Sequence, residues 1–331
     1  MCAMKLAIDP RWTGGGIGRF YSEIVARIAL GDLELEYLNV DIPLANPLSP
    51  VAIGRALGRS GCDLFWSPGF MPPVGARVPY VITIHDLIHR DHAGASRRLY
   101  YDTCIRPLAR KARAILTVSE YSRTQILGWL GQQAPDVKVV GSGVSTIFSP
   151  DGPRLQLDRP YWLYVGNQRR HKNIARMLEA FASSRSSSHT QLAFSGVSAD
   201  ETAKKILDLG LQNKIVFLGD LDEARLATAY RGALAAIQVS LCEGFGLPVV
   251  EAMASGVPVV CSSTTSLGEI AADAALLVNP TDVDEIASAM DALWSDRGEQ
   301  GRLRGLGLQR SVRFSWDEVS LKAEEALRAV V

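Results

Sequence analysis

Two glutamates and two glycines lie together in a short segment of the second half of the chain. In CEGFGLPVVEAMASGVPVV, seven residues separate Glu243 from Glu251, and Gly244 and Gly246 follow the first glutamate. A helix that begins near Leu247 would present free backbone N–H groups at its first turn, where they bind anions such as phosphate. Glu251, one turn into this helix, could accept hydrogen bonds from ribose hydroxyls, and Glu243 could accept them from a sugar. Taken alone, the segment also fits a buried strand, turn and helix with solvated carboxylates.

A cluster of basic residues follows a strand in the sequence YVGNQRRHKNIARMLEAF. The apolar run ends at Gly166, and Arg169, Arg170, His171 and Lys172 precede a helix-like stretch. Cations at the carboxyl end of a strand can neutralise a diphosphate, and each charge-assisted hydrogen bond contributes about 1.5 to 3 kcal/mol. The cluster therefore suits a diphosphate leaving group, although a basic loop in solvent has the same composition.

Two segments of the first half could meet the same ligand. The apolar run YVITIHD ends in His85 and Asp86, so a histidine could donate a hydrogen bond to a hydroxyl or a developing charge. A structural histidine bonded to a carbonyl is the alternative. The run TGGGIGRF follows the first strand, and the N–H groups of Gly14, Gly15 and Gly16 could meet a phosphate. This run lacks the third glycine of G-x-G-x-x-G, so the fingerprint of dinucleotide binding is absent.

The stretch from Arg97 to Arg113, RRLYYDTCIRPLARKAR, holds basic residues against a single acid, Asp102, with aromatic and aliphatic residues between them. Helical spacing would give a basic, partly aromatic face that suits anionic lipid headgroups. A solvated helix explains the same pattern. Contact with a membrane surface is therefore one of two interpretations of this stretch.

Apolar runs of strand length recur along the chain and alternate with helical or irregular stretches. This alternation predicts parallel sheets covered on both faces, in an α/β fold. The segment FSPDGPRLQLDRP, rich in Pro, Gly and Asp, interrupts the pattern, so we expect two doubly wound domains of residues 1–155 and 156–331. The last stretch, 317–331, is amphipathic and could pack back on the first domain. The predicted strands lie within residues 5–9, 34–40, 63–68, 80–86, 114–120, 138–143, 161–167, 191–196, 214–220, 235–240, 257–263 and 274–280.

Composition restricts the remaining possibilities. The 331 residues are 47% hydrophobic, enough for two cores, and 35 basic residues balance 35 acidic ones, so net charge does not indicate a nucleic-acid partner. The five cysteines lie far apart, without zinc-ligand spacing, which favours reduced thiols in the cytoplasm. No apolar run approaches about 18 residues, and the first residues lack the apolar region of a signal peptide.

Taken together, these segments resemble glycosyltransferase family 4, the retaining enzymes with the two-domain GT-B architecture, and among them bacterial mannosyltransferases of surface-polysaccharide assembly. The most specific segment is EGFGLPVVEAMASG, and it is accompanied by TGGGIGRF, TIHDL, ILTVSEYSRTQIL, LYVGNQRRHKN and IVFLGDLDEARLATAYRGA in the family's order. The resemblance implies two Rossmann-like domains facing a cleft. The N-terminal domain would lie on the acceptor side, and the C-terminal domain would bind the nucleotide-sugar.

The resemblance also implies catalytic and binding roles. His85 would lie beside the transferred sugar, Lys172 would bind the diphosphate and Glu243 would lie near the donor sugar, as the three catalytic residues. Glu251 would bind the donor ribose. Base recognition in this architecture relies largely on backbone groups near the strand KIVFLGD, so these residues do not identify the base.

Other binding residues follow from the same match. Many family members place an arginine directly after the glycine at 166, where this chain has Asn167, so Arg169 or Arg170 would supply that cation. The remaining substrate-binding candidates are the donor-closing loop at Gly15 and Gly16 and the sugar- and phosphate-binding backbone of Gly244, Phe245, Gly246 and Leu247.

The expected function is transfer of a hexose, by overall similarity mannose from GDP-mannose, to a saccharide or lipid-linked saccharide. Lys172 with Arg169 or Arg170 would stabilise the departing diphosphate, so neither a metal ion nor a cofactor is expected. A UDP- or dTDP-sugar is the alternative donor. An epimerase or phosphorylase built on the same fold and a non-catalytic sugar-binding protein are alternative functions. The expected location is the cytoplasm, with contact at the inner membrane face through Arg97 to Arg113 as a further expectation.

Overall fold

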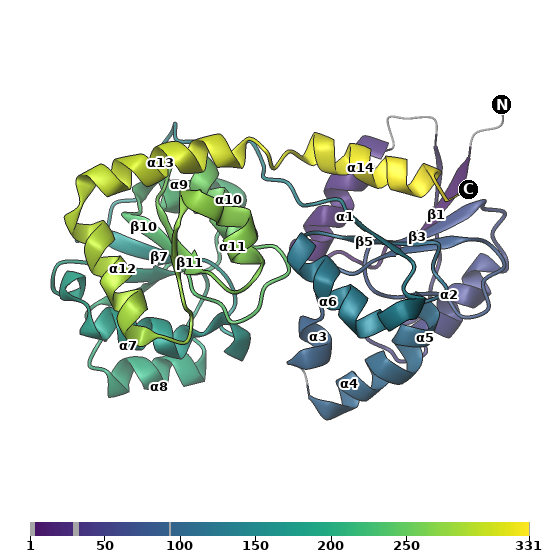
Figure 1. Ribbon diagram of the computed structural model, residues 1–331, viewed down its shortest axis with the longest axis horizontal. Helices are drawn as coiled ribbons and strands as arrows, with labels where there is room; N and C mark the ends of the chain where they lie inside the picture. Colours follow the sequence, from purple (N-terminus) through teal and green to yellow (C-terminus); the bar gives the residue numbers. More distant parts are fainter. Residues whose placement is uncertain (1–3, 29–32, 93, 331) are drawn as a thin grey trace. The chain divides into compact units, whose positions relative to one another are not determined.

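The computed structural model describes residues 4–28, 33–92 and 94–330, and the chain forms two compact units (Figure 1). The first unit joins Met1–Gly143 to Ser315–Val331, and the second is Val144–Phe314. Each unit contains one parallel sheet of six strands with helices on both faces. The predicted α/β class with doubly wound sheets is confirmed.

The boundary between the units lies at Gly143 and Val144, before the predicted position near residue 155. The Pro- and Gly-rich segment belongs to the second unit because its backbone is hydrogen-bonded there. The Leu155 N–H donates to the Thr228 carbonyl at 3.0 Å. The Arg231 guanidinium donates to the Pro153 carbonyl at 2.7 Å.

The first sheet has the strand order β2-β1-β3-β4-β5-β6, and all of its neighbours are parallel. Its strands are β1 (Lys5–Ile8), β2 (Glu34–Tyr37), β3 (Leu64–Ser67), β4 (Tyr80–Thr83), β5 (Ala114–Thr117) and β6 (Asp136–Val139). The direction of winding reverses between β1 and β3. Ligands of open α/β sheets bind at the carboxyl ends of the strands on either side of such a switch point.

The second sheet has the order β12-β11-β10-β7-β8-β9, the dinucleotide-fold order with its switch point between β7 and β10. Its strands are β7 (Tyr161–Tyr164), β8 (Gln191–Phe194), β9 (Ile215–Phe217), β10 (Ala235–Gln238), β11 (Val259–Ser262) and β12 (Leu276–Val278). Every residue of β7, β10 and β11 is buried, as expected for parallel strands with helices on both faces.

The helices cover the two sheets (Figure 1). Those of the first unit are α1 (Gly15–Ile28), α2 (Ser49–Leu57), α3 (Ile88–Asp91), α4 (Ala95–Tyr100), α5 (Arg106–Ala109), α6 (Glu120–Leu130) and α14 (Trp316–Arg328). Those of the second are α7 (Ile174–Ser183), α8 (Asp200–Asp208), α9 (Glu223–Gly232), α10 (Leu247–Ala254), α11 (Ser266–Ala271), α12 (Val283–Ser295) and α13 (Arg297–Ser311). Within the described ranges, no helix is both long and apolar enough to cross a bilayer.

The final helix, α14, packs on α1 within the first unit. The Trp316 ring meets Phe20 edge-on, with ring centroids 6.3 Å apart, and Arg27 donates to Asp317 at 2.6 Å. Gly143 lies directly beneath Trp316, where an added Cβ would come within 2.6 Å of the indole. The chain thus returns to its first unit after completing the second.

Candidate active site

The switch point of the second sheet brings two loops together. Strands β7 and β10 pair only through Ala235 with Trp162 and Ala236 with Leu163. Beyond this pairing, a side chain joins the two strands: Gln238 donates to the Val165 carbonyl at 2.8 Å. The loops that follow both strands therefore start side by side at the carboxyl edge of the sheet.

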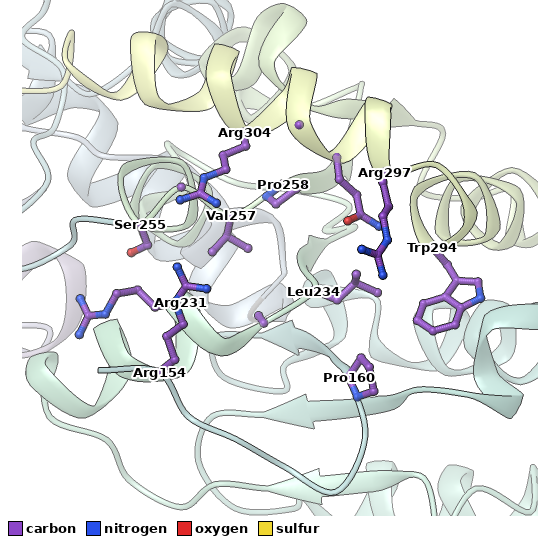
Figure 2. A pocket seen from close by; sticks show the side chains of 14 residues that line it. Arg154, Pro160, Arg231, Leu234, Ser255, Val257, Pro258, Trp294, Arg297 and Arg304 are labelled. Atoms are coloured by element: carbon purple, nitrogen blue, oxygen red, sulfur yellow. The ribbon is translucent and has the colours of Figure 1, made fainter. Parts of the chain in front are cut away.

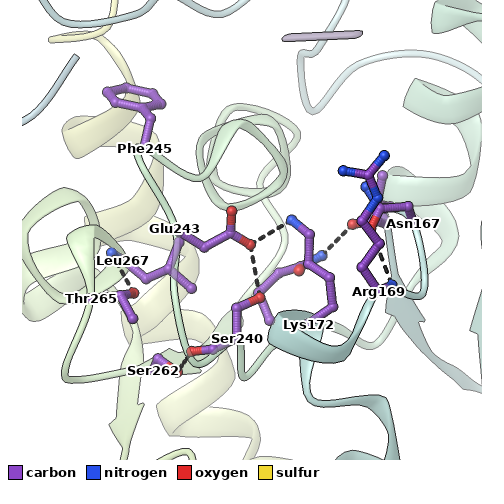
Figure 3. A network of polar contacts seen from close by, with 12 residues as sticks. Asn167, Arg169, Lys172, Ser240, Glu243, Phe245, Ser262, Thr265 and Leu267 are labelled. Carbon is purple, nitrogen blue, oxygen red and sulfur yellow. Dashed lines mark hydrogen bonds and ion pairs between the residues drawn. The ribbon is translucent and has the colours of Figure 1, made fainter. Parts of the chain in front are cut away.

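Lys172 and Glu243, which are far apart in the sequence, form an ion pair between these loops (Figure 3). The Lys172 Nζ lies 2.6 Å from Glu243 Oε1, and each side chain is only 12% exposed. Ser240 donates to the same carboxylate oxygen at 2.8 Å. Poor solvent screening strengthens this pair, so the two groups present a fixed charge arrangement to a ligand.

The glycine segment after Glu243 has a locked backbone. Gly246 has φ 105°, and an added Cβ would lie 2.2 Å from Leu267 Cδ2, so only glycine fits there. The Ser266 hydroxyl donates to the carbonyls of Glu243, at 2.9 Å, and Phe245, at 3.1 Å. Helix α10 begins at the next residue, Leu247, as the sequence predicted. Internal contacts therefore define the shape of the segment.

Glu251 lies one turn into α10 and is 4% exposed. The Tyr230 hydroxyl, from α9, donates to Glu251 Oε2 at 3.1 Å and to the Pro248 carbonyl at 3.2 Å. The carboxylate thus joins α9 to α10 as well as lying near the start of the helix. Sequence reasoning missed Tyr230, because no pattern links residues of two different helices.

Replacing Glu251 by glutamine is expected to weaken binding of the nucleoside diphosphate about tenfold, because an amide is a poorer acceptor for ribose hydroxyls than a carboxylate. Calorimetry measures the affinity directly. Tyr230→Phe serves as the matched control: it removes the internal bond to Glu251 and should lower the melting temperature while nucleotide affinity stays near wild type. Equal affinity in Glu251→Gln and wild type would remove Glu251 from the ribose site.

The two arginines of the basic loop do not reach the ion pair. Arg170 lies 3.8 Å from Glu201, and its side chain is 90% exposed. The Arg169 N–H donates to Asn167 Oδ1 at 3.2 Å, and Figure 3 shows the Arg169 guanidinium apart from Glu243. Exposed ion pairs contribute little, so the contact with Glu201 does not hold Arg170 in place. Lys172 is therefore the cation of this loop that the structure pairs with Glu243.

A cavity of about 540 Å³ opens beside the switch point, at the carboxyl ends of β7, β8 and β9. Its walls come from the loop at 165–168, the loop at 195–199 and the residues Asp220 and Leu221. The Gln168 side chain clamps the first two loops together by donating to the Val197 carbonyl at 2.7 Å and accepting from the Ala199 N–H at 3.0 Å. Its volume suits an organic ligand of nucleotide size. Sequence reasoning missed the loop at 195–199, because the predicted strand QLAFSG extends to Gly196, whereas β8 ends at Phe194.

His85 lies in the first unit, directly after β4. Its Nε2 lies 3.0 Å from the Pro68 carbonyl, and its ring meets Phe20 edge-on at 4.8 Å. Burial lowers the pKa of His85 to about 4, so the ring is neutral near pH 7. Because a carbonyl only accepts, Nε2 carries the proton and Nδ1 remains an acceptor. The sequence allowed two interpretations, a donor to the ligand and a histidine bonded to a carbonyl. The ring's one proton is bonded to the Pro68 carbonyl, as in the second.

The glycine run of the first unit lies at the start of α1. Gly15 and Gly16 are the first residues of this helix and both are exposed. Gly15 has φ 61°, and nothing lies within 4 Å of an added Cβ. The run is therefore open to a ligand. It shares its unit with His85, whereas Lys172, Glu243 and Glu251 belong to the other unit.

Fewer cations of the stretch from Arg97 to Arg113 are exposed than the sequence suggested. Arg97, Arg98, Lys111 and Arg113 are exposed, as is the apolar Leu99 at 64%. Arg110 instead donates to the Leu130 carbonyl at 2.9 Å, which fixes its guanidinium against α6. The stretch is also irregular, since a π-helical turn at Tyr101–Ile105 separates α4 from α5.

Residues 148–305 match the family model described as glycosyl transferases group 1, and residues 25–143 match the one described as glycosyl transferase 4-like domain. The two matches cover most of both units.

Among residues 4–28, 33–92 and 94–330, no group of three or more His, Cys, Asp and Glu side chains could hold a metal ion.

Relatives in sequence include two mannosyltransferases. The chain is 29% identical over 265 residues to O-antigen chain mannosyltransferase B from Escherichia coli, with 75% of this chain and 70% of that protein covered. It is 31% identical over 271 residues to the MMP alpha-(1->4)-mannosyltransferase from Mycolicibacterium hassiacum, with 73% and 63% covered. The chain thus spans less than two thirds of the second relative.

The fold is that of solved two-domain proteins. Sucrose-phosphate synthase from Thermosynechococcus elongatus superposes with a TM-score of 0.81 over 99% of both chains, at 18% sequence identity. At this identity the likeness establishes the fold alone.

Proposed function

We propose that this chain, which belongs to the group 1 glycosyltransferases with the GT-B fold, transfers a hexose with retention of anomeric configuration from a nucleotide-sugar to a saccharide or lipid-linked saccharide. The proposed donor is GDP-mannose. Its support is the two mannosyltransferases among the relatives. A UDP- or dTDP-sugar is the alternative donor.

The observation that carries this proposal is the Lys172 and Glu243 pair at the switch point between β7 and β10. One cation and one carboxylate, held 2.6 Å apart, suit a ligand that carries both phosphate and sugar hydroxyls. The nearby cavity of about 540 Å³ leaves room for a nucleoside beside them. An epimerase would need more carboxylates or histidines around the sugar than Glu243 and Glu251, the carboxylates that the described part of this site holds.

In the proposed reaction, the bond between the sugar anomeric carbon and the diphosphate oxygen breaks, and its electron pair leaves with the diphosphate. Lys172 stabilises the negative charge that grows on that oxygen, an effect larger in the transition state than in the ground state. The acceptor hydroxyl attacks the same face of the sugar, and its proton passes to the departing phosphate. Glu243 orients the sugar by accepting hydrogen bonds from its hydroxyls.

The donor is tested by thermal shift with GDP, UDP, dTDP and ADP. A ligand present at about 100 times its dissociation constant stabilises the folded protein by about 2.7 kcal/mol. The largest shift is expected with GDP. A larger shift with UDP or dTDP would replace GDP-mannose as the donor, and no shift with any of the four would contradict a nucleotide-sugar substrate.

Transfer is expected to continue unchanged in the presence of a chelator. The positive charge of Lys172, assisted by Arg169 or Arg170, takes the place that a divalent cation holds in other transferases. Activity is measured with EDTA and with added magnesium or manganese after dialysis. Complete loss of transfer in EDTA with recovery on addition of either metal would overturn the proposed metal independence.

We also propose that the protein works at the cytoplasmic face of a membrane, bound through the exposed cations of the stretch from Arg97 to Arg113. Vesicles that contain phosphatidylglycerol should sediment the wild-type protein, and Arg97→Glu/Lys111→Glu should stay in solution because each cation near the surface contributes about 1 kcal/mol. Arg59→Glu/Arg77→Glu, also exposed in the first unit, is the charge-matched control. Equal sedimentation of both double variants would exclude this stretch as the contact.

A further inference from the structure

A second, larger cavity of about 720 Å³ lies at the amino-terminal ends of strands of the second sheet (Figure 2). Its lining includes Pro160, Leu234 and Pro258, which directly precede β7, β10 and β11. The cavity is therefore at the amino ends of the same strands whose carboxyl ends carry the candidate active site. Helix α10 connects the two places, since it begins beside the glycine segment and ends at Ala254, directly before Ser255.

Four arginines line this cavity: Arg154, Arg231, Arg297 and Arg304. Its lining contains no carboxylate. Arg297 and Arg304 share one face of α13, because they are seven residues apart, two turns of helix. Within the described ranges, Arg154, Arg297 and Arg304 form no ion pair with an acidic side chain. Unpaired guanidinium groups gathered around a recess attract multivalent anions.

The backbone around the arginines is shaped to accommodate them. Gly152 has φ 126°, and an added Cβ would lie 3.1 Å from the Arg231 Cζ. Gly256 has φ 68°, and its added Cβ would lie 3.2 Å from the Arg304 Nε. Arg231 is held in place by the Pro153 carbonyl, to which it donates at 2.7 Å. It therefore contributes a fixed positive charge, whereas the exposed Arg154, Arg297 and Arg304 can close on a ligand.

A buried hydroxyl in the lining is left without a partner. Ser255 is 3% exposed, and its Oγ forms no hydrogen bond with any described residue. Burying a hydroxyl without a hydrogen-bond partner is unfavourable. Figure 2 shows Ser255 on the same side of the cavity as Arg154, Arg231 and Arg304. A ligand oxygen at this point would satisfy the hydroxyl while meeting the arginines.

From the unpaired arginines and the unsatisfied Ser255, we propose that this cavity binds a soluble ligand with two or more phosphate groups, separately from the nucleotide-sugar. Guanidinium groups bind phosphate oxygens through two parallel hydrogen bonds, and several of them around one recess favour a polyphosphate over a single phosphate. The cavity volume lies within the range of small-molecule sites.

Calorimetric titration with inorganic pyrophosphate tests this site, with GDP present to fill the candidate active site. Arg297→Ala/Arg304→Ala should weaken pyrophosphate binding at least about tenfold, and Ser255→Ala should weaken it about two- to tenfold. Arg302→Ala/Arg313→Ala removes two positive charges as well, one in α13 and one two residues after its end. Both arginines lie outside the cavity lining, so this variant should bind as wild type.

Three results would overturn the proposal. Pyrophosphate could fail to bind the wild-type protein once GDP is present. Both double variants could lose affinity equally, which would indicate a nonspecific effect of charge. Phosphatidylcholine vesicles containing phosphatidic acid could bind through these arginines while pyrophosphate does not, which would make the ligand a lipid. Unchanged melting temperatures show that any loss of binding is not a loss of folding.

Discussion

Replacement of Lys172 by alanine is expected to lower kcat by about a hundredfold or more and to weaken nucleoside diphosphate binding about 10- to 150-fold. Lys172 is a partly buried cation of the site: its side chain is 12% exposed, and its Nζ lies 2.6 Å from Glu243 Oε1. A charge-assisted contact with the diphosphate contributes about 1.5 to 3 kcal/mol to binding, and stabilisation of the charge developing on the leaving group adds to the loss in kcat. Steady-state kinetics and calorimetry measure the two effects separately.

Controls distinguish the loss of this charge from general damage. Lys204→Ala removes an exposed lysine of the same unit, in α8, and should leave both quantities near wild type. Lys172→Arg should recover part of the nucleotide affinity, since the charge returns with a different geometry. Lys172→Ala also leaves the Glu243 carboxylate with Ser240 as its remaining partner, so its melting temperature must be recorded. Wild-type kcat and affinity in Lys172→Ala would remove it from the diphosphate site.

Replacement of His85 by alanine is expected to lower kcat about 10- to 150-fold and to leave nucleoside diphosphate affinity nearly unchanged. The residues assigned to the nucleotide and diphosphate belong to the second unit, whereas His85 belongs to the first. The ring is neutral, but positive charge develops on the transferred sugar in the transition state. The lost hydrogen bond therefore counts as one to a charged group, about 1.5 to 3 kcal/mol, which gives this range of rates. Turnover at saturating donor and acceptor, compared with calorimetry, measures the two quantities.

His92→Ala, an exposed histidine of the same unit, is the control and should turn over as wild type. His85→Gln should keep more activity than the alanine variant, because its amide can still donate to the Pro68 carbonyl and accept from a ligand. Full turnover in His85→Ala would make this histidine structural.

The lowered pKa of His85 adds a pH dependence to stability. Its pKa is about 4 in the folded protein and about 6.5 in the unfolded chain, so the unfolded chain binds the proton first as the pH falls. The free energy of unfolding should therefore decrease between about pH 6.5 and pH 4, by up to about 3 kcal/mol from this group. Because the ring stays neutral above that range, its titration should not affect kcat near pH 7.

The strands and the local shape of the site could be predicted from the sequence, because they depend on neighbouring residues. Apolar runs and the turns after them predicted the strands of both sheets, although β6 begins two residues before its predicted run. The start of α10 at Leu247 follows from Pro248 in its first turn and from Gly246, whose backbone has φ 105°. The glycine segment could thus be recognised as the start of a helix before the fold was known.

Features that depend on strand order could not be predicted. Lys172 and Glu243 meet because β7 lies beside β10 in the sheet, and nothing in the pattern of apolar runs states which strands are neighbours. The domain boundary lies earlier than predicted for a similar reason. The Leu155 N–H is hydrogen-bonded to the Thr228 carbonyl, more than 70 residues away in the chain. His85 donates its ring proton to the carbonyl of Pro68, a residue that follows a different strand.

The central claim, transfer of a sugar from a nucleotide-sugar to an acceptor, is tested most directly by release of nucleoside diphosphate with and without acceptor. GDP-mannose is incubated with the wild-type protein and with Lys172→Ala, and GDP and transferred mannose are quantified. We expect the wild type to release GDP only when an acceptor is present, in amounts equal to the mannose transferred. Lys172→Ala should release GDP at least about a hundredfold more slowly. Conversion of the donor sugar into its epimer without an acceptor, or equal release by both proteins, would contradict it.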